Sequence, residues 1–128
     1  AIIAQLGTPD MRLPIQYALY YPERRFLAGD RVDFGKIARI TFENPDTDNF
    51  IGLKLAYEAG RIGGSMPTVF NAANEKAVAK FLDRKIGFLE ITDIIQYCME
   101  NHKVKENPSV SEILEIEQWA YELIENRW

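Results

Sequence analysis

Residues 67–85, with the sequence PTVFNAANEKAVAKFLDRK, carry the longest helical pattern in the chain. Their apolar side chains recur every three or four residues, which is the spacing of a single helix face: Phe70, Ala73, Ala77 and Phe81. Pro67 suits a first helical turn, where its missing N–H would have no partner in any case. The stretch therefore predicts an amphipathic helix that packs through this row.

Two further helical segments lie on either side of this one. The first covers about residues 50–62 and ends at Gly63-Gly64, which is typical of a helix C-terminus. We expect one side of it to carry Leu53, Ala56, Tyr57 and Gly60. The other segment ends before Lys103, and its apolar row is Ile91, Ile94, Ile95, Cys98 and Met99.

A fourth helix begins at Ser109, where the pattern Ser-Val-Ser-Glu is a capping box. In such a box Ser109 and Glu112 satisfy each other's free backbone N–H groups. The apolar row that follows is Ile113, Ile116, Ala120, Leu123 and Ile124. Four amphipathic helices with short connections predict a four-helix bundle-like domain over residues 46–128.

The first 45 residues have a different pattern. We expect a strand over 1–6, a turn over 7–10 and a helix over 11–20, with Pro14 in its first turn and Pro22 ending it. Residues 23–36 resemble a surface connection, and the alternation over 37–42 predicts a second strand.

The fold class expected for the whole chain is α+β and mostly α. A truncated strand-helix-strand remnant, residues 1–45, precedes the helical domain, residues 46–128. Two strands alone are marginal in water, so they need the helices, a second copy or preceding residues as support. The opening Ala1 follows no initiator Met, and we expect the sequence to be part of a longer polypeptide.

Composition and charge exclude several classes of protein. The chain has 128 residues, 47% hydrophobic and 27% charged, which fits a water-soluble domain. The net charge is −4 and no basic stripe is present, so nucleic acid is an unsuitable partner. The longest stretch without a charged residue, 62–74, is too short to span a membrane. The single cysteine excludes an internal disulfide and fits a reducing, cytoplasmic location.

Few residues have side chains suited to catalysis or to metal binding. We interpret His102 as a partner for the last carbonyls of its helix, and Cys98 as a buried apolar side chain. Ser65 and Ser109 suit caps and turns, and Asn71 and Glu75 suit hydrogen bonds to backbone groups between helices. Asp46 and Asp48 lie in a loop before a helix, without the alternate oxygen ligands of a calcium loop. No catalytic residue and no metal ligand is therefore predicted in this chain.

The segment from Gly7 to Arg12 is the remaining candidate site. A strand that ends in a glycine turn and enters a helix places backbone N–H groups and the soft side chain of Met11 at a sheet edge. Small-molecule sites often form there, although a generic strand-turn-helix corner explains the same pattern.

Five stretches together identify a resemblance to a known family. They are AQLGTPDMRLPI at 4–15, LKLAYEA at 53–59, FNAANE at 70–75, SVSEILE at 109–115 and Trp119-Ala120. In order and spacing they resemble 1-deoxy-D-xylulose 5-phosphate reductoisomerase, over the end of its central catalytic domain and its C-terminal helical domain.

The resemblance implies a function for the longer polypeptide. Members convert 1-deoxy-D-xylulose 5-phosphate to 2-C-methyl-D-erythritol 4-phosphate for isoprenoid precursor synthesis, with NADPH and a divalent metal, Mn²⁺ or Mg²⁺, as homodimers. Pro9 and Met11 match the family's Pro-Asp-Met turn and imply contacts to the nicotinamide ring, while Asp10 and Arg12 hold the turn. The family's substrate and metal residues precede this region, so we expect the chain alone to be inactive and to hold neither cofactor nor metal. The alternative is a non-catalytic helical interaction or scaffolding module.

Overall fold

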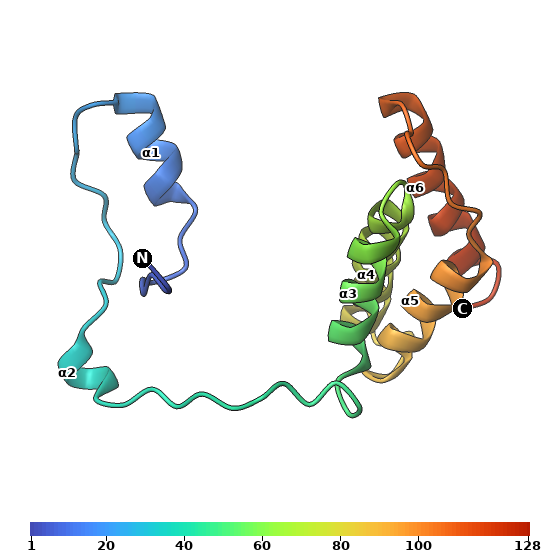
Figure 1. The fold of residues 1–128 in the computed structure, drawn as a ribbon, viewed down its shortest axis with the longest axis horizontal. Helices are drawn as coiled ribbons and strands as arrows, with labels where there is room; N and C mark the ends of the chain where they lie inside the picture. Colours follow the sequence, from blue (N-terminus) through green and yellow to red (C-terminus); the bar gives the residue numbers. More distant parts are fainter. The chain divides into compact units, whose positions relative to one another are not determined.

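Helix α4 (Met66–Leu82) is the element around which the second half of the chain is built. The computed structural model describes residues 1–128, and the chain divides into two units, Ala1–Glu43 and Asn44–Trp128. In the second unit α4 packs against three other helices (Figure 1). They are α3 (Ile51–Ile62), α5 (Glu90–Asn101) and α6 (Val110–Glu125).

Small side chains let α4 approach its neighbours closely. Ala72, Ala73 and Ala77 are fully buried, and Val69 lies beside them with no exposed surface. A methyl group adds little thickness to a helix, so backbones can pack tightly around this face. The apolar row predicted for this helix is confirmed, with its two alanines buried and its two phenylalanines half-buried.

The core of the second unit joins all four of its helices. It is made of Leu55, Ala59, Met66, Val69, Ala73, Ala77, Ile94, Ile95, Cys98, Met99 and Ile124. Ile94 of α5 and Ile124 of α6 are the largest of the side chains with no exposed surface. The apolar row predicted for α5 therefore faces the core, and so does the row predicted for α6 apart from Ile113, which is half-buried outside the core.

The start of α6 follows the predicted capping box. Ser109 Oγ accepts a hydrogen bond from the Glu112 N–H, and the Glu112 carboxylate accepts one from the Ser109 N–H at 2.7 Å. Two backbone donors at the helix start are satisfied in this way.

The face predicted for α3 is wrong. The helix buries Leu55 and Ala59, four residues apart, while Leu53, Tyr57 and Gly60 are exposed. Apolar residues surround most of this helix, so its spacing alone does not single out one face.

The first unit contains two helices, α1 (Arg12–Tyr20) and α2 (Phe34–Ile37). The strands predicted over residues 1–6 and 37–42 are absent, so the chain is all-helical and the α+β expectation is wrong on this point. Neither segment has a neighbouring strand in the chain to complete a hydrogen-bond ladder, and an isolated pair is marginal in water. Helix α2 occupies the end of the predicted connection and takes Ile37 from the second predicted strand.

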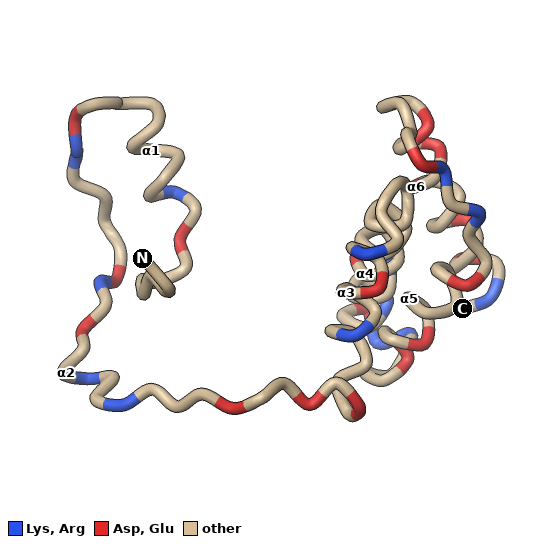
Figure 2. Tube along the Cα trace, in the orientation of Figure 1, with Lys and Arg blue, Asp and Glu red and all other residues tan.

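No helix combines the length and the apolar character that crossing a lipid bilayer requires. Charged residues occur along every helix of the second unit (Figure 2).

Candidate functional site

The corner before α1 is held together by Asp10 and Arg12. The Asp10 carboxylate accepts the Arg12 N–H at 3.0 Å, the guanidinium Nε at 2.9 Å and one terminal nitrogen at 2.7 Å. These bonds turn the chain into the helix, because they engage a free N–H of its first turn. The structural role predicted for this pair is supported by its geometry.

The same contacts set the electrostatics of the corner. Hydrogen bonds from Arg12 lower the pKa of Asp10, and the bond to Asp10 raises the pKa of Arg12. Both groups therefore stay ionised at neutral pH. They neutralise each other and leave the corner without free charge.

Pro9 and Met11 are the sequence neighbours of Asp10, and Met11 lies between the two members of the ion pair. Pro9 lines a hollow of about 530 Å³, and Met11 is 72% exposed without lining it. The structure thus presents both side chains at the surface of one turn, with an apolar ring and a polarizable thioether open to contact. Their contact with a nicotinamide ring stays a prediction.

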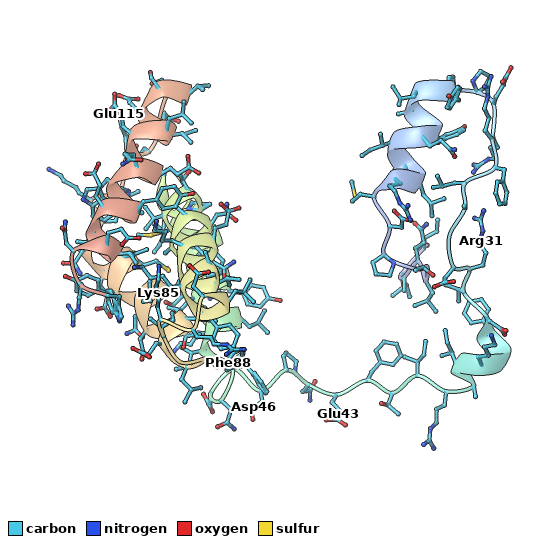
Figure 3. The ribbon with its side chains drawn as sticks, turned by 180° about the vertical axis from the view of Figure 1, so that it is seen from behind. Arg31, Glu43, Asp46, Lys85, Phe88 and Glu115 are labelled. Atoms are coloured by element: carbon cyan, nitrogen blue, oxygen red, sulfur yellow. The ribbon has the colours of Figure 1, made fainter.

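Part of this hollow is lined by a segment that the sequence analysis did not identify as functional. Asp30, Arg31, Val32, Asp33, Lys36 and Ile37 contribute to it. Arg31 is labelled on this segment in Figure 3. Asp33 shapes the wall by capping α2, since its carboxylate accepts the N–H groups of Gly35 and Lys36 at 2.9 Å and 3.2 Å. The Asp-Phe-Gly-Lys sequence at 33–36 is the one signal that could have predicted this cap.

His102 and Ser65 form a hydrogen bond that the sequence did not predict. His102 Nε2 lies 2.7 Å from Ser65 Oγ, which also accepts the Lys105 N–H at 2.9 Å. The imidazole therefore fastens α4 to the segment after α5, instead of contacting the last carbonyls of its own helix. Ser65 is fully buried and precedes α4 without capping it, so its hydroxyl is closed to substrate.

Two other sequence interpretations have clear outcomes. Cys98 is buried and free, as predicted, and burial raises its pKa to about 11, so it is protonated at neutral pH.

Asn71 does not bond backbone groups between helices, because its side-chain amide donates to Glu75 of the same helix at 3.5 Å. The connection to α6 comes instead from Tyr121, whose hydroxyl donates to Glu75 at 3.4 Å.

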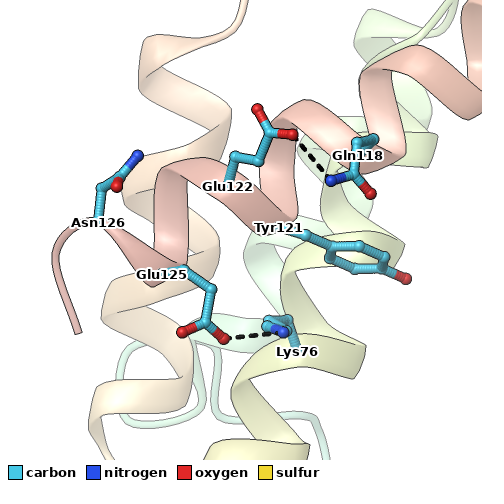
Figure 4. Close-up of a pocket in the computed structure, with 6 residues that line it drawn as sticks. All are labelled: Lys76, Gln118, Tyr121, Glu122, Glu125 and Asn126. Carbon is cyan, nitrogen blue, oxygen red and sulfur yellow. Dashed lines mark hydrogen bonds and ion pairs between the residues drawn. The ribbon is translucent and has the colours of Figure 1, made fainter.

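A second hollow, of about 460 Å³, lies between α4 and α6 (Figure 4). Four of its six lining residues form two pairs. Lys76 contacts Glu125 at 2.8 Å, and Gln118 donates to Glu122 at 2.8 Å. The Lys76–Glu125 pair joins the two helices and engages the one cationic side chain that lines this hollow.

Nowhere in the chain do three or more histidine, cysteine, aspartate or glutamate side chains gather where they could hold a metal ion. The residues present therefore do not fit a divalent metal, and no chemical step is assigned to one here.

Comparison with known proteins identifies the family. The profile of the DXP reductoisomerase C-terminal domain matches residues 6–123. This chain belongs to the DXP reductoisomerase family. It is 64% identical over 128 residues to the 1-deoxy-D-xylulose 5-phosphate reductoisomerase of Agathobacter rectalis and 59% identical to that of Lachnospira eligens. It spans about a third of the length of these relatives, 34% in both cases.

Solved structures of the family share the fold. The reductoisomerase from Zymomonas mobilis, determined in complex with NADPH, matches with a TM-score of 0.79 and 40% identity, over 98% of this chain and 33% of that one. A DOX-P reductoisomerase determined with NADPH, fosmidomycin and magnesium matches with a TM-score of 0.80 and 33% identity, over the same shares. The predicted family membership is thereby confirmed.

Proposed function

We propose that this chain is the C-terminal part of an NADPH-dependent enzyme that converts 1-deoxy-D-xylulose 5-phosphate to 2-C-methyl-D-erythritol 4-phosphate. The observation that carries the proposal is the family match over residues 6–123, together with 64% identity to a named reductoisomerase. Residues 1–45 would then end the catalytic domain, and residues 46–128 would form the helical domain.

In this proposal the corner before α1 contributes to cofactor binding. Pro9 and Met11 would pack against the nicotinamide ring of NADPH, because a thioether makes favourable contacts with an aromatic system. Asp10 and Arg12 keep the turn in shape through the bonds described above. The hydride donor is NADPH, while these residues position its ring.

The metal ligands and the substrate-binding residues would come from the part of the enzyme that this chain does not include. The chain alone is then inactive, and it would hold neither NADPH tightly nor a metal. We also propose a homodimer for the longer enzyme, as the family resemblance implies. The free, buried Cys98 supports a reducing, cytoplasmic location.

A chimera tests the proposal directly. This chain replaces the matching third of the Agathobacter rectalis enzyme, and NADPH oxidation is measured with 1-deoxy-D-xylulose 5-phosphate and Mn²⁺. We expect turnover from the chimera and none from the 128-residue chain. A folded chimera without turnover would favour the scaffolding alternative, and turnover by the chain alone would contradict the proposed division of labour.

Variants of the chimera test the corner. Met11→Ala is expected to raise the KM for NADPH by roughly two- to tenfold with little change in kcat, since one sulfur–aromatic contact is lost. Met11→Leu keeps the apolar volume and should raise the KM less. An unchanged KM in Met11→Ala would remove this residue from the cofactor site.

A further inference from the structure

Three arginines line one small hollow in the first unit. It has a volume of about 210 Å³ and lies between α1 and the segment that follows it. The lining residues are Leu13, Gln16 and Tyr17 of α1, with Arg24, Arg25 and Arg31 of the following segment. Figure 2 shows the pair of adjacent basic residues where this segment leaves α1, and Figure 3 labels Arg31 farther along it.

Two hydrogen bonds shape the segment beside the helix. The Gln16 side-chain amide donates to the carbonyl oxygen of Phe26 at 3.2 Å, which ties the segment to α1. Arg31 donates from one terminal nitrogen to the carbonyl oxygen of Leu27 at 3.3 Å, which bends the segment back on itself. The arginines are thus carried on a backbone that two side chains fasten.

Two of the guanidinium groups are oriented by tyrosine rings. Arg24 lies over the ring of Tyr17 at 4.6 Å, and Arg25 lies over the ring of Tyr20 at 4.1 Å. Such stacking uses the flat face of a guanidinium and leaves the N–H groups at its edge free to donate. The rings therefore restrict the arginines without consuming their hydrogen-bond donors.

The positive charge at this hollow is not balanced. Glu23 pairs with Arg25 at 3.2 Å, whereas Arg24 and Arg31 take part in none of the ion pairs of the structure. Two unmatched guanidinium groups that line one hollow repel, and an anion bound in it would offset that repulsion.

We propose that this hollow binds a phosphate group, either inorganic phosphate or the phosphate of a small ester. The planar N–H fork of arginine matches phosphate oxygens in pairs, which favours this anion over a halide. The volume is smaller than the roughly 300–1,000 Å³ of pockets that enclose whole drug-sized ligands, so it suits a single phosphate head. The inference stands on the first unit alone and does not depend on the proposed function.

Nuclear magnetic resonance tests the site on the 128-residue chain. Inorganic phosphate is titrated at constant ionic strength while backbone amide and arginine Nε–H signals are followed. We expect saturable shifts at Gln16, Tyr17, Arg24 and Arg31 with a Kd of about 1 mM. A parallel titration with ribose 5-phosphate separates the two sources, since tighter binding of the ester would assign the site to esterified phosphate.

Charge-matched variants decide whether the hollow is responsible. Arg24→Gln and Arg31→Gln should each weaken binding by about tenfold, since each removes a charged hydrogen bond. Arg39→Gln removes the same charge from the same unit outside the hollow and should leave binding unchanged. Circular dichroism checks that α1 persists, and Arg24→Lys, which keeps the charge but loses the fork, should weaken binding even where Arg24→Gln unfolds the helix.

Three results would overturn the proposal. The first is shifts that do not saturate or that spread over all cationic residues. The second is an equal loss of affinity in Arg39→Gln. The third is the same shifts on raising protein concentration without phosphate, because the arginines would then bind carboxylates of another copy of the chain.

Discussion

Lys80 of α4 is buried, and its ammonium group donates to the Glu125 carboxylate of α6 at 3.1 Å. It also donates to the carbonyl oxygen of Trp128 at 3.1 Å, while the other oxygen of Glu125 contacts Lys76 at 2.8 Å. One half-exposed carboxylate therefore serves two lysines of the neighbouring helix. A buried ammonium needs such a partner, because an unpaired buried charge destabilises the fold by far more than an exposed ion pair stabilises it.

Removing this carboxylate should destabilise the second unit. Glu125→Gln leaves the buried Lys80 charge with neutral acceptors only, and we expect a lower free energy of unfolding in urea. Glu122→Gln is the matched control, because Glu122 is exposed and pairs only with Gln118. In Lys80→Met with Glu125→Gln the buried charge is gone, so much of the loss should be recovered. Equal stability of Glu125→Gln and the control would contradict this account.

The same carboxylate predicts a pH dependence. Hydrogen bonds from Lys76 and Lys80 lower the pKa of Glu125 from 4.5 to about 2. Because the folded-state pKa is depressed, the stabilisation is present above pH 4.5 and is lost as the pH falls towards 2. Unfolding curves across this interval should show a steeper loss for the wild type than for Glu125→Gln. Exposure and salt will reduce the size of the difference.

The helices of the second unit could be predicted because their signals are local. Ser109 and Glu112 are three residues apart, and the capping box that they form does not depend on how the rest of the chain folds. The core face of α3 could not be predicted, since Leu53 and Leu55 are equally apolar and only the packing of α4 and α5 buries the second. The prediction of strands in the first unit was wrong for a related reason, because a strand requires a partner strand that its own residues do not specify.

The candidate sites divide in the same way. The turn that holds Pro9 and Met11 could be predicted, because the contact that holds it joins Asp10 and Arg12, which are only two positions apart in the sequence. The bond between Ser65 and His102 spans 37 positions, and nothing in either local sequence indicates it. Pairings of this kind depend on how two helix ends meet, which spacing along the chain does not encode.

Core packing gives a test of the second unit. Ile94→Ala should lower its free energy of unfolding by about 2–5 kcal/mol, because Ile94 has no exposed surface and truncation leaves a cavity. Leu82→Ala makes a similar truncation at a side chain of the same unit that is 72% exposed, and should alter stability by less than about 0.5 kcal/mol. Denaturation followed by helical circular dichroism compares the two. Similar losses of stability in both variants would contradict the burial of Ile94 in the core.

Two glycines should respond in opposite directions to alanine. Gly64 has a φ of 54°, and a Cβ there would collide with the carbonyl oxygen of Lys105. Gly64→Ala should therefore cost about 2 kcal/mol or more. Gly60 lies within α3 with open space around it, so Gly60→Ala should stabilise the unit by about 0.5–1 kcal/mol. Thermal unfolding separates the two signs, and stabilisation by Gly64→Ala would rule out the close contact.

Protonation of His102 should weaken the second unit. Its ring lies against Trp119, with the ring centroids 5.2 Å apart and the planes tilted by 46°, and burial lowers its pKa below the usual 6.5. In the neutral tautomer that carries its proton on Nδ1, Nε2 accepts a hydrogen bond from the Ser65 hydroxyl, which itself accepts one from the Lys105 N–H. A protonated ring would leave that buried hydroxyl without its acceptor. With the folded-state pKa depressed, the unfolded chain takes up a proton first as the pH falls below 6.5, and stability declines from there. His102→Gln removes the titrating group, so its unfolding free energy should vary less with pH between neutrality and the onset of carboxylate protonation. A wild type and variant with parallel profiles over that interval would show that this imidazole does not couple protonation to folding.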